Sequence, residues 1–129
     1  MTKNVVHESE VEELARPGRF MKWLITAENS GAEHLSSVLI RVPPGETVRP
    51  AHSHPNGEEM IYIIEGSGKV LIDGKVDGVR QGSAVLFPRE SVHMLQNDGE
   101  REMKVICFFA PPSDLSTYRF YEDVEFPGQ

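Results

Sequence analysis

Three histidines and one glutamate carry the clearest chemical potential in this chain: His52, His54, Glu59 and His93. His52 and His54 are two positions apart, so on an extended strand both side chains project from the same face. Glu59 follows across the turn-rich link 55–57, which lets the next strand bring its carboxylate alongside. His93 comes much later, on a strand that must pack beside the first pair. Imidazole nitrogens and a carboxylate oxygen suit a transition-metal site, so these four residues are candidate metal ligands.

Short β-strands must position these residues. Runs of β-type residues alternate with Gly and Pro over most of the chain, at 20–26, 35–42, 60–64, 69–72, 75–80, 83–87, 92–96 and 103–109. Many short strands at regular spacing predict an all-β sandwich or barrel, and no long segment has helical periodicity. Near the start, Ser9 followed by Glu12 fits a capping box, which predicts one or two helical turns before Gly18.

Two motifs around the four residues resemble the two signatures of the cupin family. In chain order, the motifs are His52-x-His54-x4-Glu59-x6-Gly66 and Gly82-x5-Pro88-x4-His93-x3-Asn97. The fifteen residues between Gly66 and Gly82 match the inter-motif segment of compact single-domain cupins. An isolated His-x-His is weak, because surface histidines occur by chance, but two motifs at the right separation are a specific signal.

The chain departs from the family pattern at two positions. Gly45 lies one residue further from the first histidine than the usual glycine, which predicts a longer approach loop. Glu90 stands two residues after the signature proline, where glycine is usual, and this puts the turn conformation in question. Glu58 is an alternative to Glu59 as the carboxylate ligand, although the spacing to Gly66 favours Glu59.

The resemblance implies a single-domain jelly-roll β-barrel, the cupin-like double-stranded β-helix, with a metal inside its open end. Three neutral imidazoles and one carboxylate suit one divalent transition metal, such as Fe, Mn, Ni, Co, Cu or Zn, and are poor ligands for calcium or magnesium. Four protein ligands leave one or two coordination positions open for water, O₂ or a substrate oxygen. Glu59 is the expected catalytic residue, acting as a proton acceptor.

Substrate-binding residues are harder to assign, because strand alternation needs a known register. The expected contacts are Arg41, Tyr62, Phe87 and Phe109. The wider set of polar candidates for a substrate carboxylate or enolate is Arg19, Arg41, Arg49 and Tyr62. The aromatic and sulfur-containing side chains that either line a pocket or fill the core are Phe20, Met21, Trp23, Phe87, Met94, Phe108 and Phe109. Cys107 lies in an apolar run and is expected to be a buried small hydrophobe.

One domain accounts for all 129 residues, with an N-terminal segment at 1–18, the barrel at 19–112 and a C-terminal strap at 113–129. The strap is too apolar for a free end, so it is expected to pack on its own barrel or on a second subunit, with a partly frayed end as the alternative. Exposed sheet edges must be covered or paired, and cupins commonly pair, so a homodimer is expected. His7 and His34 have no partner at ligand spacing and are expected at the surface.

Composition excludes several classes of function. The net charge of -7 and the pI near 5.2 argue against a nucleic-acid partner, because binding phosphates requires a basic surface. A single cysteine rules out an intramolecular disulfide and suits a reducing compartment. The start of the chain lacks an apolar signal segment and no stretch is long enough to span a bilayer, so a cytoplasmic protein with no membrane partner is expected.

Two hypotheses about function follow from the sequence. The first is a metal-dependent enzyme acting on a small oxygen-bearing organic molecule, with dioxygenase-like chemistry favoured over isomerase or lyase chemistry. The second is a non-catalytic, metal-containing module that binds a small sugar or organic acid. The complete donor set favours the enzyme, whereas the small size, with no evident lid or second domain, favours the binding module.

Overall fold

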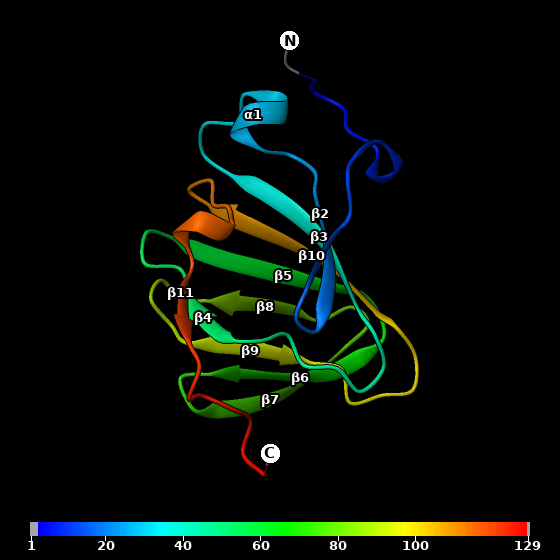
Figure 1. Ribbon diagram of the computed structural model, residues 1–129, viewed down its shortest axis with the longest axis vertical. Helices are drawn as coiled ribbons and strands as arrows, with labels where there is room; N and C mark the ends of the chain where they lie inside the picture. Colours follow the sequence, from blue (N-terminus) through cyan, green and yellow to red (C-terminus); the bar gives the residue numbers. More distant parts are fainter. Residues whose placement is uncertain (1–2, 129) are drawn as a thin grey trace.

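Two antiparallel β-sheets face each other across a hydrophobic core in the computed structural model, which describes residues 3–128 (Figure 1). The six-stranded sheet has the order β1-β2-β3-β10-β5-β8, formed by Leu14–Arg16, Arg19–Trp23, Ser36–Val42, Met103–Ala110, Glu58–Glu65 and Ala84–Phe87. The five-stranded sheet has the order β11-β4-β9-β6-β7, formed by Arg119–Tyr121, Ala51–Ser53, His93–Gln96, Ser67–Ile72 and Lys75–Arg80. This architecture confirms the predicted all-β jelly-roll barrel.

Alternation along the two long central strands explains the core. In β5 and β10 almost every second side chain is buried, because successive residues of a strand point to opposite faces of the sheet. Ile61 and Ile63 of β5 and Val105 of β10 face the opposite sheet and are essentially inaccessible to solvent. Gly68 of β6 shows how closely the chain packs, since a Cβ atom there would lie 1.9 Å from the carbonyl oxygen of Gln96.

The helical segments are short. The expected N-terminal turn is present as a single 3₁₀ turn, η1 at Glu8–Glu10, but Ser9 and Glu12 form no capping box. Instead the His7 side chain accepts a hydrogen bond from the Ser9 amide, and the chain is already extended at Val11. A four-residue helix, α1 at Ala27–Ser30, was not predicted from the sequence, and a second 3₁₀ turn, η2, spans Leu115–Thr117.

The C-terminal strap packs on its own barrel, the first of the two alternatives. It pairs β11 with β4 and so extends the five-stranded sheet by one strand. Phe126 is only 3% exposed and belongs to a small apolar cluster with Ala51, Leu71 and Met94. In Figure 1 the strap runs down beside β4 toward the C-terminus.

The turn at Glu90 keeps a glycine-like conformation without a glycine. Glu90 has φ of 68°, in the left-handed region, which L-residues other than Asn and Asp rarely adopt. Its amide donates a hydrogen bond to the His54 carbonyl at 3.3 Å, and the Ser91 amide donates to the Pro88 carbonyl at 3.0 Å. The turn therefore links the second motif to the loop that carries His54.

Replacing Glu90 with glycine should stabilise the fold by up to about 1 kcal/mol, because glycine adopts positive φ without the Cβ clash. Urea unfolding measures the change. Glu12, which is exposed and has no positive φ, is the matched control, and Glu12→Gly should be neutral or destabilising. A Glu90→Gly variant no more stable than the wild type would contradict the expected strain.

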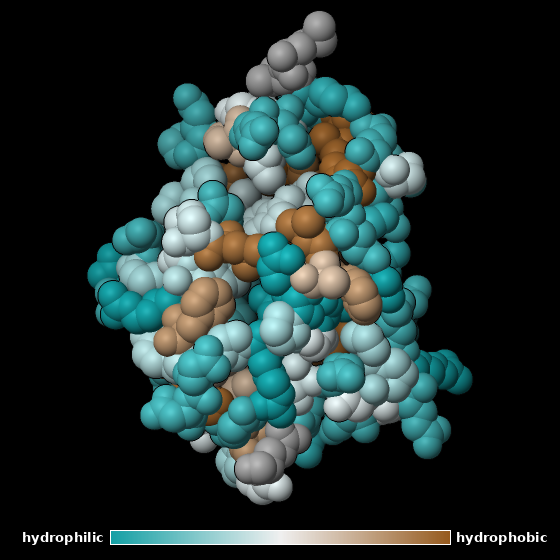
Figure 2. Space-filling model, viewed as in Figure 1, coloured by the Kyte–Doolittle hydropathy of each residue, from teal (hydrophilic) through white to brown (hydrophobic). Residues whose placement is uncertain are grey.

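Hydrophilic side chains cover most of the face shown in Figure 2, and apolar ones form small separate groups between them. Within residues 3–128, none of the helices has the length and apolar character needed to cross a bilayer.

Candidate metal centre

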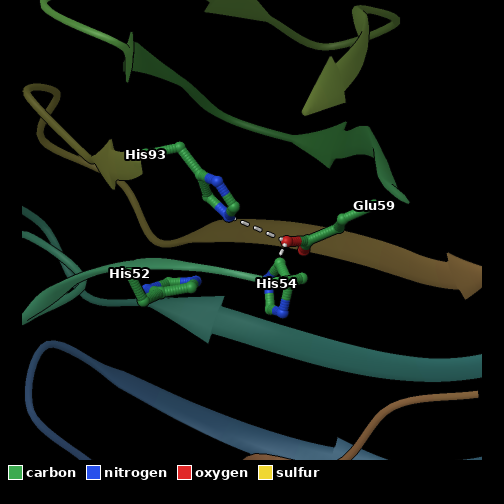
Figure 3. A group of neighbouring side chains, drawn as sticks. All are labelled: His52, His54, Glu59 and His93. Atoms are coloured by element: carbon green, nitrogen blue, oxygen red, sulfur yellow. Dashed lines mark hydrogen bonds and ion pairs between the residues drawn. The ribbon is translucent and has the colours of Figure 1, made fainter. Parts of the chain in front are cut away.

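The four predicted ligands converge at one end of the barrel, between the two sheets (Figure 3). His52 lies on β4, directly opposite His93 of β9, and His54 follows two residues later. Glu59 projects inward from the start of β5, on the other sheet. One donor atom from each residue lies within 4.8 Å of the others, and the four residues are 2–6% exposed.

Strand alternation settles the choice between the two glutamates. Glu59 is buried in the cluster, whereas Glu58 points out of the barrel and is exposed. His52 and His54 are two positions apart in the sequence, so both rings lie on the same face of the strand and point into the barrel interior, as predicted.

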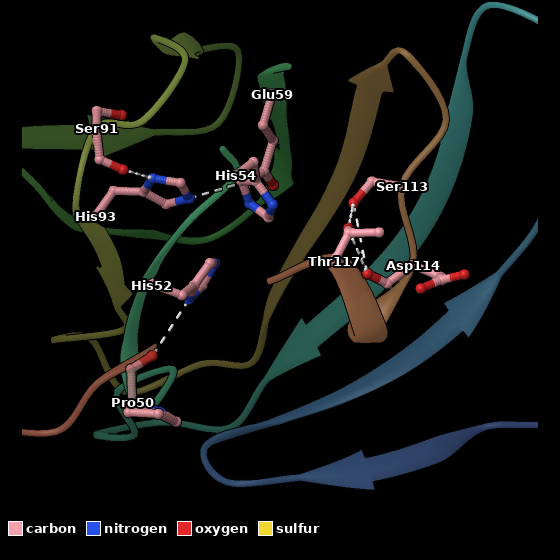
Figure 4. Close-up of polar contacts among 9 residues, drawn as sticks. All are labelled: Pro50, His52, His54, Glu59, Ser91, His93, Ser113, Asp114 and Thr117. Atoms are coloured by element: carbon pink, nitrogen blue, oxygen red, sulfur yellow. Dashed lines mark hydrogen bonds and ion pairs between the residues drawn. The ribbon is translucent and has the colours of Figure 1, made fainter. Parts of the chain in front are cut away.

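Backbone carbonyls orient two of the three imidazoles (Figure 4). Nδ1 of His52 lies 3.2 Å from the Pro50 oxygen, and Nδ1 of His93 lies 3.0 Å from the Ser91 oxygen. A carbonyl only accepts, so each Nδ1 carries the proton and a neutral ring keeps its lone pair on Nε2. Such second-shell contacts are typical of metal-ligating histidines.

Glu59 makes close contacts with two imidazole nitrogens, and these contacts require a proton or a metal ion between the carboxylate and a nitrogen that carries no hydrogen. Its Oε1 lies 2.9 Å from Nε2 of His54 and 3.0 Å from Nε2 of His93. Because Nδ1 of His93 already donates, its Nε2 can face a carboxylate oxygen at this distance only with a proton or a metal ion between them. The donor set of three imidazoles and one carboxylate fits a divalent transition metal, which would be held by His52, His54, Glu59 and His93.

Burial and mutual contact shift the pKa values in this cluster. Burial is the main reason that the pKa of His52 lies well below its usual 6.5, and the neighbouring His93 lowers it further. Burial alone would raise the pKa of Glu59, but its close contacts with His54 and His93 outweigh burial and lower the pKa. A neutral His52 and an ionised Glu59 are the forms that bind metal.

We expect the metal-free protein to lose stability in mild acid. The unfolded chain takes up a proton at His52 near pH 6.5 and at Glu59 near pH 4.5, whereas the folded chain resists both protonations. Stability therefore falls as pH drops through these values, because the unfolded state binds more protons. Bound metal should also be lost, since protons compete for the histidines.

Thermal melting and metal retention measured between about pH 8 and about pH 4.5 test this expectation. His34 is exposed and lies outside the cluster, so His34→Gln should leave both profiles unchanged. Metal retention that is constant over this range would count against a site with three histidines.

Aromatic rings line the site. Phe87 stacks on His93 with ring centroids 4.0 Å apart, and Phe109 meets His54 edge-on at 5.0 Å. Trp23 stacks on Phe109 with ring centroids 5.7 Å apart. Phe87 and Phe109, both expected substrate contacts, line the same cavity as His52, Glu59 and His93.

Arg41 and Tyr62, the other two expected contacts, do not line this cavity. Both point outward from the six-stranded sheet, where Arg41 pairs with Glu13 and Glu102 and lies over the ring of Phe20. The reason is the register. Arg41 is paired with Phe20, whose side chain also faces outward, and Tyr62 occupies an outward position of β5.

Tyr118 is a site residue that the sequence reasoning missed. Its ring stacks on His52 with centroids 4.9 Å apart and meets His54 edge-on at 4.4 Å. The strap is fixed just before Tyr118 by Asp114, which caps η2, and by the Ser113 amide, which donates to Ser36 Oγ at 2.9 Å. Figure 4 shows Asp114 beside Ser113 and Thr117 in this segment. The sequence signal for this role was an aromatic residue in an apolar tail. The path of the tail over the barrel could not be predicted from the sequence.

The cavity is small as long as the strap covers it. The centre of a water-sized sphere can occupy about 40 Å³ of it. One water needs roughly 10–15 Å³ by this measure, so the space suits a few waters or a ligand of a few non-hydrogen atoms. Apart from the metal ligands and Arg19, its walls are mostly apolar, and Cys107 is buried among them as expected.

Comparison with known proteins identifies the class. The family model of the cupin domain matches residues 38–109, which is more than half of the chain. The chain therefore belongs to this family. It is 29% identical over 111 residues to polyketide synthase CurC from Streptomyces cyaneus, covering 86% of this chain and 71% of CurC.

Solved structures support the same fold. The polyketide cyclase RemF from Streptomyces resistomycificus superimposes with a TM-score of 0.72 and 25% identity, covering 98% of this chain and 90% of RemF. Oxalate decarboxylase from Lactobacillus farciminis, solved as a formate complex, has a TM-score of 0.79 and 20% identity. That match covers 88% of this chain but 34% of the decarboxylase, so the chain spans about a third of that enzyme.

Proposed function

We propose that this protein is a metal-dependent enzyme acting on a small organic molecule with neighbouring oxygen atoms. Dioxygenase-like chemistry is favoured over isomerase or lyase chemistry. The observation that carries the proposal is the convergence of three imidazoles and one carboxylate within 4.8 Å, beside a mostly apolar cavity. A pure binding barrel has no chemical need for all four donors.

A divalent transition metal bound by these residues supplies Lewis-acid polarisation and open positions for substrate oxygens. The chain itself contributes the rest. Phe87 and Phe109 exclude water from one side of the site, and Tyr118 covers His52. Glu59 is ionised at working pH and accepts a proton from the substrate at a carboxylate oxygen.

The relatives agree with an oxygen-rich substrate. CurC and RemF are named for polyketide synthesis and cyclisation, whose intermediates carry repeated carbonyl groups. Two such oxygens on one molecule suit the open coordination positions of a four-ligand site. A substrate much larger than the present cavity would require the strap to move away from His52.

Turnover by iron-loaded protein, with and without O₂, against diketones and phenolic acids tests the proposal. Consumption that needs O₂ indicates a dioxygenase, and consumption without O₂ indicates an isomerase or lyase. Glu59→Gln should abolish turnover, and the exposed Glu58→Gln is the matched control that should preserve it. Binding without turnover across the panel would favour the alternative, a metal-containing module that binds a small organic acid or sugar.

We also propose that the protein forms a homodimer through the outer face of its six-stranded sheet. Phe108, Met60 and Leu86 lie side by side there on β10, β5 and β8, and all three are exposed. A second copy would cover the same patch on each subunit across a two-fold axis. This arrangement does not require exchange of the strap, which packs on its own barrel.

Leu86→Lys should raise the dissociation constant of the dimer by at least about tenfold, because it places an unpaired charge in a face that the dimer would bury. Light scattering at micromolar concentration measures the shift. Leu86 is 53% exposed, and Val76, which is 37% exposed on the other sheet, is the matched control position. A wild type that is monomeric, or a Val76→Lys variant that dissociates as readily as Leu86→Lys, would contradict the proposed face.

A further inference from the structure

A buried guanidinium shares the cavity with the metal ligands. Arg19 is the first residue of β2 and only 5% exposed, and its side chain points inward beside that of Met21. Neither carries out a role in the proposed chemistry. Arginine stays charged in proteins, so this is a cation placed inside a mostly apolar barrel.

Only part of the hydrogen-bonding capacity of Arg19 is used. Nη1 donates to the carbonyl oxygens of Pro17 at 3.2 Å and Arg49 at 2.9 Å. Nε and Nη2 make no hydrogen bond within the described part of the chain, and no carboxylate there forms an ion pair with Arg19. A buried charge that forms no ion pair is costly, which makes an incoming anion favourable at this place.

The backbone places this cation close to the metal ligands. Arg49 and Pro50 are consecutive, and their carbonyls accept from Arg19 and from His52 respectively. Burial lowers the pKa of Arg19, while Tyr118, Cys107 and Glu59 act in the opposite direction. Arg19 also lines the same cavity as His52, Glu59 and His93, so the guanidinium shares the interior space of the metal centre.

We propose that Arg19 determines substrate specificity by binding a carboxylate of the substrate. This inference rests on the proposed function and narrows its substrate class to small oxo acids. The carboxylate is held by the free N–H groups of Arg19, and a neighbouring oxygen faces the metal ligands. Arginine suits this task because its planar fork matches the two oxygens of a carboxylate.

Calorimetric binding to the metal-loaded protein tests the proposal with pyruvate and 2,3-butanedione. Both probes carry two neighbouring oxygens, but only pyruvate is an anion. Wild-type protein should bind pyruvate more tightly than butanedione. Arg19→Met should weaken pyruvate binding by about ten- to a hundred-fold and leave butanedione unchanged, since a hydrogen-bonded charge is lost. Arg19→Lys should fall between the two.

Arg41→Met is the matched control, because Arg41 lies on the outer face of the same sheet, and it should change neither affinity. Equal wild-type affinity for the two probes would overturn the proposal without any variant, even if Arg19→Met does not fold. Equal losses for both probes in Arg19→Met would overturn it too, since that pattern indicates a structural role.

The metal content of each sample separates this inference from the proposed function. A protein that takes up no metal and does not bind butanedione would refute the metalloenzyme. In that case pyruvate binding that depends on Arg19 would still support the anion site, and its absence would overturn it.

Discussion

Replacing His54 or His93 with alanine should abolish tight metal binding, taking the protein from an expected content of about one transition-metal ion per chain to essentially none. Each residue supplies one of four converging donors, and no other histidine in residues 3–128 lies within the cluster. Loss of a second-shell partner alone costs about 10–100-fold in affinity, so loss of a ligand should cost at least about a hundred-fold. Elemental analysis of protein purified without chelator, followed by titration with iron, manganese, nickel and zinc, measures it.

The two histidines outside the cluster provide the control for this experiment. His7 and His34 are exposed and lie outside the cluster, so His7→Ala and His34→Ala should keep the full metal content. If His93→Ala bound metal as tightly as the wild type, the close contact between His93 and Glu59 would need another explanation.

Deleting residues 113–129 should destabilise the protein and cause aggregation. The deletion removes β11, exposes the hydrogen-bonding edge of β4 and uncovers His52. It also leaves the cluster around Leu71 and Met94 without Phe126. An open apolar edge is a template for association between chains. Light scattering and urea unfolding of the shortened protein measure both effects.

Substitutions of two phenylalanines in the strap test whether its packing, rather than its mere presence, stabilises the protein. Phe126→Ala should cost about 3–5 kcal/mol of unfolding free energy, because it leaves a cavity in a closed cluster. Phe120 is 46% exposed, so Phe120→Ala should change stability by no more than about 0.5 kcal/mol. A shortened chain that is as soluble and stable as the full protein would show that the strap is a surface appendage.

The convergence of three of the four candidate metal ligands could be predicted from sequence because their geometry is local. Spacing of two on a strand fixes the common face of His52 and His54, and a turn followed by a strand brings Glu59 alongside. The pairing of His93 with His52 required two motifs at a fixed separation, which the resemblance supplied. The repeated strand and turn pattern predicted an all-β sandwich or barrel, and the resemblance added the jelly-roll, whereas the order of the strands in the two sheets was not predicted.

The substrate side of the site could not be predicted in the same way. Arg19 and Arg41 are both arginines on neighbouring strands, yet one faces the cavity and the other the solvent. A shift of one residue in the pairing of the two strands would exchange these faces, and the pairing could not be deduced from the residue pattern alone. The position of Tyr118 depended on the path of a tail without clean periodicity, which tertiary packing alone determines.

The turn at Glu90 bears on how sequence signatures are interpreted. A glycine in a family pattern records a dihedral angle that the backbone must adopt, and here the angle persists although the glycine has gone. The angle matters because it brings the Glu90 amide to the carbonyl of His54, one of the four candidate metal ligands. A pattern search that demands glycine would discard this chain, whereas one that asks which residues tolerate the left-handed region at some cost would keep it. During divergence, such a position is free to gain a charged, solvent-facing side chain as long as the rest of the barrel compensates for the strain.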